Sequence, residues 1–347
     1  MKVGVYAIAK NEEQFVRRWA ESAADADSIL LLDTGSDDGT VEAARALGVE
    51  THVFRFDPWR FDTARNMALS MCDPYLDYVI ALDLDEVLVP GWRDHLLEAC
   101  ANGVTRPRYK YTWSWQGSQP GLQYGGDKIH SRQGYVWKHP VHEVLVPTSV
   151  EVQGWCGLEI HHHPDGKKSR SQYLPLLEIA VTEDPDDDRN AYYLARELFF
   201  SGDLERAKVE FQRHLNLAKA VWPPERAQSY RYLFKITGDL NYLNDAVAEA
   251  PGRREAWVDM AQHFHDEQMW LACLQAAKKA LAITVKPLDY ICEPQAWGSL
   301  PHDLAAVAAF RCGFFHEARF HGQQAVNLSP YETRLVDNMR FYSEAAA

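Results

Sequence analysis

The sequence lacks the features that mark membrane-spanning, disulfide-bonded and zinc-finger proteins. Its 347 residues contain no apolar run of about 18 residues, the length that a bilayer crossing needs. Its six cysteines are scattered without a CxxC pair, which predicts reduced thiols and no structural zinc. The N-terminus does not read as a signal peptide, because its short strand runs straight into charged residues. These absences predict a cytoplasmic protein without a membrane span.

Positive charge is also scarce. The chain has 36 Lys and Arg residues against 49 Asp and Glu residues, a formal net charge of −13. General nucleic-acid binders are basic, so this balance excludes that class. It does not exclude a nucleotide substrate, whose site needs only a few local cations. The length allows two or three domains, and 46% hydrophobic residues suit a globular protein.

A short acidic stretch organises the first half of the chain. Residues 79–82 read as a buried strand, and Asp83, Asp85 and Glu86 follow it. Ligands of open α/β sheets bind at the carboxyl ends of strands, where carboxylates can hold a divalent cation that bridges to phosphate. Strand periodicity predicts that Asp83 and Asp85 lie on one side and Glu86 on the other. For an Asp-x-Asp pair alone, a solvated acidic turn is the competing interpretation.

Strands and helices alternate around this stretch. We expect strands over residues 3–9, 28–32, 49–54 and 79–82, and helices over 14–24, 41–47 and 61–71. This order predicts a mostly parallel sheet with right-handed crossovers. Three of the strands end in polar, acid-bearing loops, which together would surround one pocket. An ordinary capping turn is the alternative for the second of these loops.

Four motifs, in this order and at this spacing, resemble the family 2 glycosyltransferases of GT-A fold. They are VYAIAKNEE at residues 5–13, LDTGSDDGT at 32–40, ARN at 64–66 and LDLDE at 82–86. The resemblance implies a Rossmann-like α/β GT-A domain and a nucleotide-diphosphate sugar donor, with a UDP-sugar favoured. It implies an inverting, hexosyltransferase-type enzyme that uses Mn²⁺ or Mg²⁺. The metal would neutralise charge that develops on the departing nucleoside diphosphate.

The resemblance also implies roles for individual residues. Ala7, Glu12 and Asp33 would lie near the base and ribose, and Arg65 near the base or phosphates. Asp83 would lie at the ribose or metal, and Asp85 would bind the metal directly. The whole expected nucleotide-sugar site comprises Ala7, Glu12, Asp33, Gly35, Arg65, Asp83, Leu84 and Lys138.

Residues 105–138 are locally basic and rich in aromatic side chains. The cations are Arg106, Arg108, Lys110, Lys128, Arg132 and Lys138, and the aromatics are Trp113, Trp115, Tyr124, Tyr135 and Trp137. One interpretation is an acceptor cleft, with aromatic faces for sugar rings or apolar groups and cations for phosphates. The other is the amphipathic face of a cross-sheet.

The candidate catalytic pair is His142 and Glu143. Inverting transfer needs a group that takes the acceptor proton, and Glu143 is the predicted base, with His142 orienting the site or touching phosphate. A structural salt bridge or a cap is the alternative.

Three histidines at 161–163 end a later strand, and imidazole suits a transition metal. The resemblance favours His162 as a metal ligand, whereas strand alternation places His161 and His163 together on one face. Residues 165–169 read as a mobile polar lid that could contact the diphosphate.

From residue 185 the chain reads as helical. Small and aromatic residues over 190–211, 257–280 and 306–330, with a degenerate copy at 230–250, match the tetratricopeptide pattern. We therefore predict a GT-A domain over 1–182 and an all-α, tetratricopeptide-like helical repeat domain over 183–347. Such repeats offer a concave face that commonly binds a peptide or a second subunit, which points to a protein partner or a homodimer.

Two other functions compete with the glycosyltransferase hypothesis. A non-catalytic helical-repeat adaptor with a vestigial nucleotide-sugar-binding domain should have lost its acids, yet Asp33, Asp83 and Asp85 are all present. A sugar nucleotidyltransferase would need a Gly-rich, Arg-bearing loop after the first strand, where this chain reads KNEE. The acceptor, whether a glycan, a peptide or another macromolecule, is not identified by the sequence.

Overall fold

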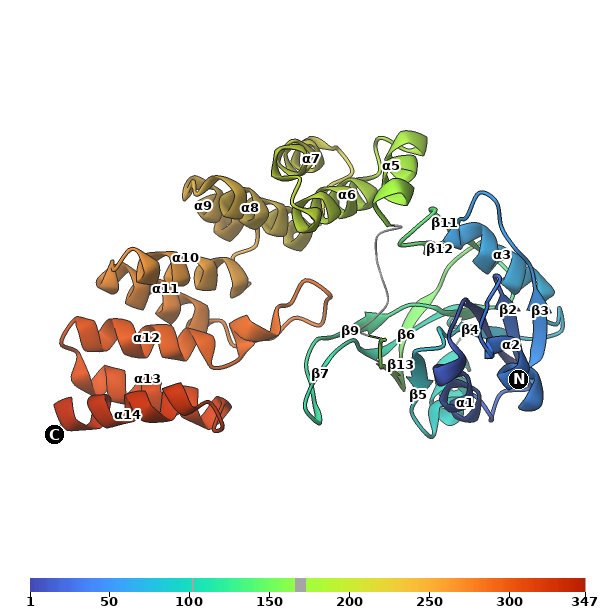
Figure 1. The fold of residues 1–347 in the computed structure, drawn as a ribbon, viewed down its shortest axis with the longest axis horizontal. Helices are drawn as coiled ribbons and strands as arrows, with labels where there is room; N and C mark the ends of the chain where they lie inside the picture. The colour runs from blue at the N-terminus through green and yellow to red at the C-terminus, as the bar shows by residue number, and fades with distance from the viewer. Residues whose placement is uncertain (102, 166–172, 347) are drawn as a thin grey trace. The chain divides into compact units, whose positions relative to one another are not determined.

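The structure is a computed structural model that describes residues 1–101, 103–165 and 173–346. The chain divides into two compact units, Met1–Glu183 and Asp184–Ala347 (Figure 1). Among the described residues, none of the helices combines the length and the apolar character that a bilayer crossing requires.

A five-stranded sheet forms the centre of the first unit. Its strand order is β10-β4-β1-β2-β3. The strands are β1 (Val3–Ala9), β2 (Ser28–Asp33), β3 (Glu50–Val53), β4 (Tyr78–Ala81) and β10 (Ile129–Ser131). β1 pairs in parallel with β2 and β4, β2 pairs in parallel with β3, and only β10 runs antiparallel to its neighbour β4. The predicted mostly parallel sheet is confirmed.

Both faces of this sheet are covered, because alternate side chains of β1 enter different cores. Val5 and Ala7 pack in one cluster with residues of α1 (Glu13–Ser22) and α2 (Thr40–Ala46). Tyr6 and Ile8 pack in another with residues of α3 (Phe61–Met71). A strand buried on both faces is apolar throughout, which explains why β1 shows no polar alternation.

A second, four-stranded sheet has the order β5-β13-β6-β9. Its strands are β5 (Glu86–Leu88), β13 (Gln153–His162), β6 (Arg106–Thr112) and β9 (Gln123–Gly126), and α4 (Trp92–Cys100) packs on β13. The smaller elements are β7 (Trp115–Gln116), β8 (Gln119–Pro120), β11 (Tyr135–Lys138), β12 (Val144–Pro147) and α5 (Tyr173–Glu183). The antiparallel register of β13 on β5 sets His162 opposite Glu86, so the histidine strand ends beside the acidic turn.

The second unit is helical throughout its described length and contains four helical hairpins (Figure 1). They are α6 (Asp188–Ser201) with α7 (Leu204–Asn216), α8 (Pro223–Thr237) with α9 (Asn241–Glu249), α10 (Glu255–Asp266) with α11 (Trp270–Ala282), and α12 (Leu300–Arg311) with α13 (Phe315–Leu328). A short 3₁₀ helix, η1 (Pro294–Trp297), precedes α12, and α14 (Thr333–Ala345) follows α13. The predicted all-α repeat architecture is confirmed.

Small residues allow the repeat helices to approach closely. Ala277 on α11 and Ala305 and Ala309 on α12 are fully buried where these helices pack together. Gly202 ends α6 with a φ of +88°, a left-handed conformation that a glycine adopts without strain. Alanine at helix crossings and glycine at the turn are the features that the repeat pattern predicts.

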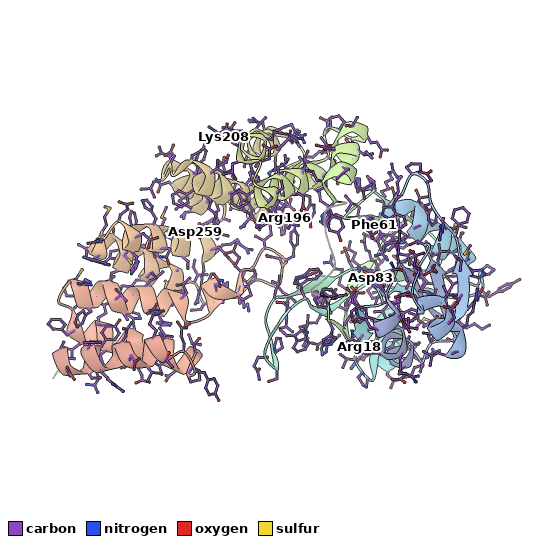
Figure 2. All side chains as sticks on the ribbon, viewed as in Figure 1. Arg18, Phe61, Asp83, Arg196, Lys208 and Asp259 are labelled. Atoms are coloured by element: carbon purple, nitrogen blue, oxygen red, sulfur yellow. The ribbon has the colours of Figure 1, made fainter. Side chains whose placement is uncertain are left out.

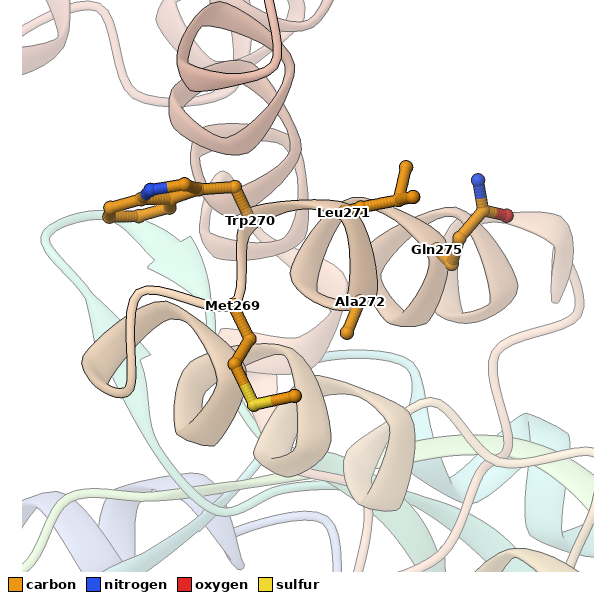
Figure 3. Close-up of a pocket in the computed structure, with 5 residues that line it drawn as sticks. All are labelled: Met269, Trp270, Leu271, Ala272 and Gln275. Carbon is orange, nitrogen blue, oxygen red and sulfur yellow. The ribbon is translucent and has the colours of Figure 1, made fainter.

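A shallow hollow lies where α11 begins. It is lined by Met269, Trp270, Leu271, Ala272 and Gln275 (Figure 3). Met269 and Leu271 are more than half exposed there, and none of the five lining residues is titratable. The hollow is therefore an apolar surface feature without catalytic groups.

Candidate active site

The acidic stretch after β4 forms a turn and not a continuing strand. β4 ends at Ala81, two residues before Asp83. The backbone N–H of Glu86 donates to the carbonyl of Asp83 at 2.9 Å, and Glu86 Oε2 accepts the Asp83 backbone N–H at 2.9 Å. The expectation that Glu86 lies on the opposite side from Asp83 is therefore wrong. The chain leaves the sheet before the acids, so the two-residue strand period does not apply to them.

Two cations converge on this turn. Lys128 Nζ donates to Asp83 Oδ2 at 2.6 Å and to Glu86 Oε1 at 3.0 Å. Arg65 Nη2 donates to Asp83 Oδ1 at 2.8 Å, and Tyr111 donates its hydroxyl to Glu86 Oε1 at 2.6 Å. Asp83, labelled in Figure 2, is thus the shared acceptor of Arg65 and Lys128.

The pKa values of Asp83 and Glu86, which both accept from Lys128, shift in opposite directions. Burial acts to raise the pKa of Asp83, but the charges of Arg65 and Lys128 outweigh it and hold that pKa well below its usual range. Burial dominates at Glu86 and raises its pKa, although Lys128 opposes the shift. Asp83 is therefore ionised at neutral pH, in contact with two cations.

The side chains of Asp85 and His162 lie close together. Asp85 Oδ2 lies 3.4 Å from His162 Nε2. The other ring nitrogen, Nδ1, lies 2.9 Å from the carbonyl oxygen of Trp113, and the two rings stack with centroids 4.2 Å apart. Burial lowers the pKa of His162, but the hydrogen bond and charge of Asp85 raise it by more, above the ordinary value.

This pair fits a metal ion. Two ligand atoms that each bind one cation at about 2.0–2.2 Å lie roughly 3 to 4 Å apart, and the 3.4 Å separation of Asp85 Oδ2 and His162 Nε2 falls in this range. A metal-binding histidine usually has its second nitrogen fixed by another group, as the Trp113 carbonyl fixes Nδ1 here.

The neighbouring histidines lie on the other side of the strand. His161 Nε2 lies 3.0 Å from Glu159 Oε1. The rings of His161 and His163 both contact Trp115, at centroid distances of 4.8 and 5.6 Å. The structure therefore brings His162 to Asp85 and places the side chains of His161 and His163 together against Trp115.

Glu143 joins the acidic network through Arg65. Arg65 Nε donates to Glu143 Oε1, so one buried guanidinium links Glu143 to Asp83. His142 adopts a φ of +51°, and its ring meets Tyr173 edge-on at 5.5 Å. Lys138 is exposed at the end of β11, and no ion pair among the described residues ties it to the network. The structure thus gathers Glu143, but not Lys138, around Asp83.

The two loops after β1 and β2 bind each other. Asp33 Oδ1 accepts the backbone N–H groups of Gly35 and Ser36 at 2.9 Å each, and its Oδ2 accepts the Ser36 hydroxyl. The Glu12 backbone N–H donates to Thr40 Oγ1 at 2.8 Å. Asp33 is fully buried and shapes its loop, and its contact with a nucleotide stays a prediction.

Three other predicted residues occupy special positions near these loops. Gly35 has a φ of +105°, and a Cβ there would lie 2.9 Å from Arg55 Nε, so only glycine fits without strain. The side chains of Ala7 and Leu84 belong to the hydrophobic core. Any part that Ala7 and Leu84 play in the site is therefore through their backbone.

Sequence reasoning does not place three residues beside the acidic turn and its histidine. Lys128 stands out only as part of a basic region, because nothing in the linear sequence indicates that β10 pairs beside β4. Trp113, one of the aromatics for which an acceptor cleft is one interpretation, stacks on His162. Arg18, labelled in Figure 2, has its Nε and Nη2 buried without a hydrogen-bond partner among the described residues. Burial lowers the pKa of Arg18, and the Asp85 carboxylate opposes this shift.

The predicted lid lies almost wholly outside the described residues, which stop at Asp165 and resume at residue 173. Asp165 itself accepts a hydrogen bond from Gln14 Nε2 on α1 at 2.9 Å.

Solved structures resemble this chain at low identity. TarS of S. aureus is 12% identical, with 72% of this chain and 53% of TarS covered and a TM-score of 0.36. A tetratricopeptide repeat protein from Parabacteroides merdae is 17% identical, with 50% of this chain and 65% of that chain covered and a TM-score of 0.36. A thermophilic TPR protein of Thermus thermophilus is 19% identical, with 50% of this chain and 88% of that chain covered and a TM-score of 0.33.

The family comparison concerns the unit that carries the acidic turn. Residues 5–142 match the family described as glycosyl transferase family 2. This range contains all four sequence motifs together with Asp83, Asp85, Arg65 and Lys128. Residues 5–142 of the first unit are thus a glycosyl transferase family 2 match, and an all-α unit of helical hairpins follows them.

Proposed function

We propose that this protein is a metal-dependent inverting glycosyltransferase that moves a sugar from a nucleotide-diphosphate sugar, most simply a UDP-sugar, to an acceptor not yet identified. The observation that carries the proposal is the facing pair of Asp85 and His162, set beside the Arg65–Asp83–Lys128 network at the carboxyl end of β4. Open α/β sheets bind their ligands at this edge.

Buried guanidinium nitrogens without a hydrogen-bond partner support the binding of an anionic nucleotide-sugar donor. Arg65 Nη1 and the Nε and Nη2 atoms of Arg18 are buried without a hydrogen-bond partner among the described residues. A buried donor without an acceptor is costly, by roughly 1–3 kcal/mol or more for a charged group. A diphosphate would accept these N–H groups, and guanidinium pairs with phosphate oxygens especially well.

Asp85 and His162 are the proposed metal ligands. Carboxylate oxygen with imidazole nitrogen suits Mn²⁺ better than Mg²⁺, which prefers oxygen alone. When bound, the ion would neutralise negative charge on the departing nucleoside diphosphate. Acidic residues outnumber cations here, since Asp83, Glu86 and Glu143 pair with Arg65 and Lys128, and Asp85 lies beside His162.

Glu143 is the proposed base. Arg65 holds Glu143 Oε1, which leaves Oε2 as the oxygen that would receive the acceptor proton. The acceptor oxygen would form a bond to the anomeric carbon as the bond from that carbon to the diphosphate oxygen breaks, with inversion at the carbon. His142, which directly precedes Glu143 in the chain, would orient this side of the site. Ala7, Glu12 and Asp33 would line the pocket for the nucleobase and ribose.

The helical hairpins support a further part of the proposal, that a protein partner or a second copy binds the repeat domain. Stacked hairpins of this kind offer an extended face for such partners. A cytoplasmic location is consistent with this proposal.

The test is the release of nucleoside diphosphate from a panel of UDP-, GDP-, CDP- and dTDP-sugars with Mn²⁺ and a mixed acceptor pool. We expect release from one nucleotide class, lost when EDTA removes the metal. A folded protein that releases nothing from any donor under these conditions would contradict the proposal.

A further inference from the structure

A second group of metal-binding side chains lies in the helical unit. Asp188 at the start of α6, His214 on α7 and Glu225 on α8 place one ligand atom each within 4.8 Å of one another. The three residues come from three different helices of the first two hairpins. They belong to the other unit from Asp85 and His162, and the proposed glycosyl transfer uses none of them.

The imidazole of His214 is buried with one nitrogen unsatisfied. His214 is fully buried, and its Nδ1 lies 2.9 Å from the Ser229 hydroxyl. Its Nε2 has no hydrogen-bond partner among the described residues and lies 4.0 Å from Glu225 Oε2, beyond hydrogen-bond range. This buried nitrogen is therefore available to bind a ligand.

The side chain of Glu225 is also buried, and a neighbouring group fixes one of its oxygens. It is 4% exposed, and the Tyr290 hydroxyl donates to its Oε1, so Oε2 is the oxygen on the side of His214. Metal ligands in proteins characteristically have their second nitrogen or oxygen fixed by a neighbouring group. Ser229 does this for His214, and Tyr290 does it for Glu225.

We propose that Asp188, His214 and Glu225 bind one divalent transition-metal ion of the Zn²⁺ class. Two atoms at about 2.1 Å from a common ion are at most about 4.2 Å apart, and the 4.0 Å between His214 Nε2 and Glu225 Oε2 meets this limit. Asp188 is only half-buried, so its side chain can rotate to bring its carboxylate, which lies within 4.8 Å of the other two ligand atoms, onto the ion.

The charged surroundings are compatible with a cation. The charges of Arg213 and Arg226 contribute to lowering the pKa of His214. Each arginine is paired with a carboxylate, Arg213 with Glu210 at 2.7 Å and Arg226 with Glu249 at 2.8 Å. Burial, helped by Arg226 and Arg213, lowers the pKa of His214 to about 4, so its imidazole is neutral at pH 7.

Burial raises the pKa of Glu225 to about 8, and the charges of Arg189 and Arg196 oppose this shift. Arg189 and Arg196, the latter labelled in Figure 2, both stack on the Tyr193 ring, at 4.9 and 4.5 Å from its centroid. Asp187 and Asp188 oppose their charge at Glu225. A bound ion would tie α6, α7 and α8 together at the start of the repeat domain.

The experiment is zinc titration of the metal-stripped full chain by calorimetry, in an Asp85→Ala background that removes a ligand of the donor site. We expect one equivalent of Zn²⁺ in Asp85→Ala, and at least tenfold weaker binding when Glu225→Gln or Asp188→Asn is added. Glu225→Gln keeps the size of the side chain and its contact with Tyr290, so it should fold, which far-UV circular dichroism checks. Glu317→Gln, which alters a carboxylate of the same unit that pairs with Lys278 at 2.7 Å, is the matched control and should leave zinc affinity unchanged.

A second readout is thermal. Zn²⁺ should raise the Tm of the Asp85→Ala protein and leave that of Asp85→Ala/Glu225→Gln unmoved. Absence of zinc binding in Asp85→Ala would overturn the proposal. So would a zinc affinity that stays the same as in Asp85→Ala when Glu225→Gln or Asp188→Asn is added.

Discussion

Arg65 donates from Nη2 to Asp83 Oδ1 at 2.8 Å and so fastens α3 to the acidic turn after β4. The same guanidinium donates to Glu143 and lies 5.1 Å from the centroid of the Trp137 ring. Arg65 is 4% exposed, so these contacts are made away from water. One side chain therefore organises the acidic turn, the proposed base and the ring beneath them.

Replacing Arg65 should destabilise the first unit. Arg65→Met leaves Asp83 and Glu143 without their shared partner, and breaking a buried ion pair in this way costs roughly 3 kcal/mol. We expect the free energy of unfolding to fall by that order in urea denaturation. Arg17→Met, which removes an exposed arginine paired with Glu21, should change it by less than about 0.5 kcal/mol. Equal stability of the two variants would show that the Arg65 network contributes nothing to folding.

His162 and His161 should respond differently to substitution. His162→Ala removes the nitrogen that faces Asp85, and we expect Mn²⁺-dependent nucleotide binding to weaken by about tenfold or more. His161→Ala removes a ring that faces Glu159 and Trp115, and we expect binding within about twofold of the natural protein. Calorimetry of both variants decides the assignment, and the reverse order of effects would move the metal to the other face of β13.

Glu143→Gln should separate donor binding from transfer. The amide keeps an oxygen for Arg65 but cannot take a proton, so donor affinity should persist while transfer falls by about 10²–10⁴-fold. Single-turnover product formation measures the second quantity. Glu151→Gln, whose parent side chain pairs with Arg106, is the control and should transfer normally. A fully active Glu143→Gln protein would require another base.

His130 should make the first unit sensitive to acid. Its ring is fully buried on β10, between the Tyr6 hydroxyl at 3.3 Å and the Ser131 carbonyl at 2.8 Å. Burial lowers the pKa of His130 to about 4. Above pH 6.5 the His130 ring is neutral in both the folded and the unfolded chain. As the pH falls from 6.5 towards 4, the unfolded chain binds a proton that the folded chain does not, and stability is lost, by about 3 kcal/mol in full.

The measurement for His130 is the free energy of unfolding between pH 4 and pH 7. His130→Gln should flatten this dependence, whereas His52→Gln, at a partly exposed position on β3, should not. A His130→Gln protein with the same pH dependence as the natural one would contradict the assignment.

The sequence predicts the central strands β1 and β4 because they are buried on both faces. Val3–Ala9 is apolar at every position, and the structure gives β1 those bounds. The periodicity of α3 likewise predicts Phe61–Met71. Local patterns of this kind depend on neighbours in the chain and are visible without a fold.

The contacts of the site could not be predicted in the same way. Lys128 reaches Asp83 only because β10 pairs antiparallel with β4, a pairing between segments about 50 residues apart. Glu86 joins Asp83 because the chain turns directly after β4, where strand periodicity predicts an extended segment. The sequence favours His162 over His161 and His163 only through the resemblance to family 2 glycosyltransferases. The position of His162 beside Asp85 depends on the register of β13 on β5.

The central claim is that the acidic turn binds a nucleotide-sugar donor through a metal ion. Its most direct test is calorimetric titration of UDP, GDP, CDP and dTDP, each with and without Mn²⁺, into the natural protein and into Asp85→Ala. We predict tight binding of one nucleotide, only with Mn²⁺, lost in Asp85→Ala while the helical domain stays folded. No binding of any nucleotide, or unchanged binding by Asp85→Ala, would contradict the account, and the former result would favour a non-catalytic adaptor that acts through its helical repeats.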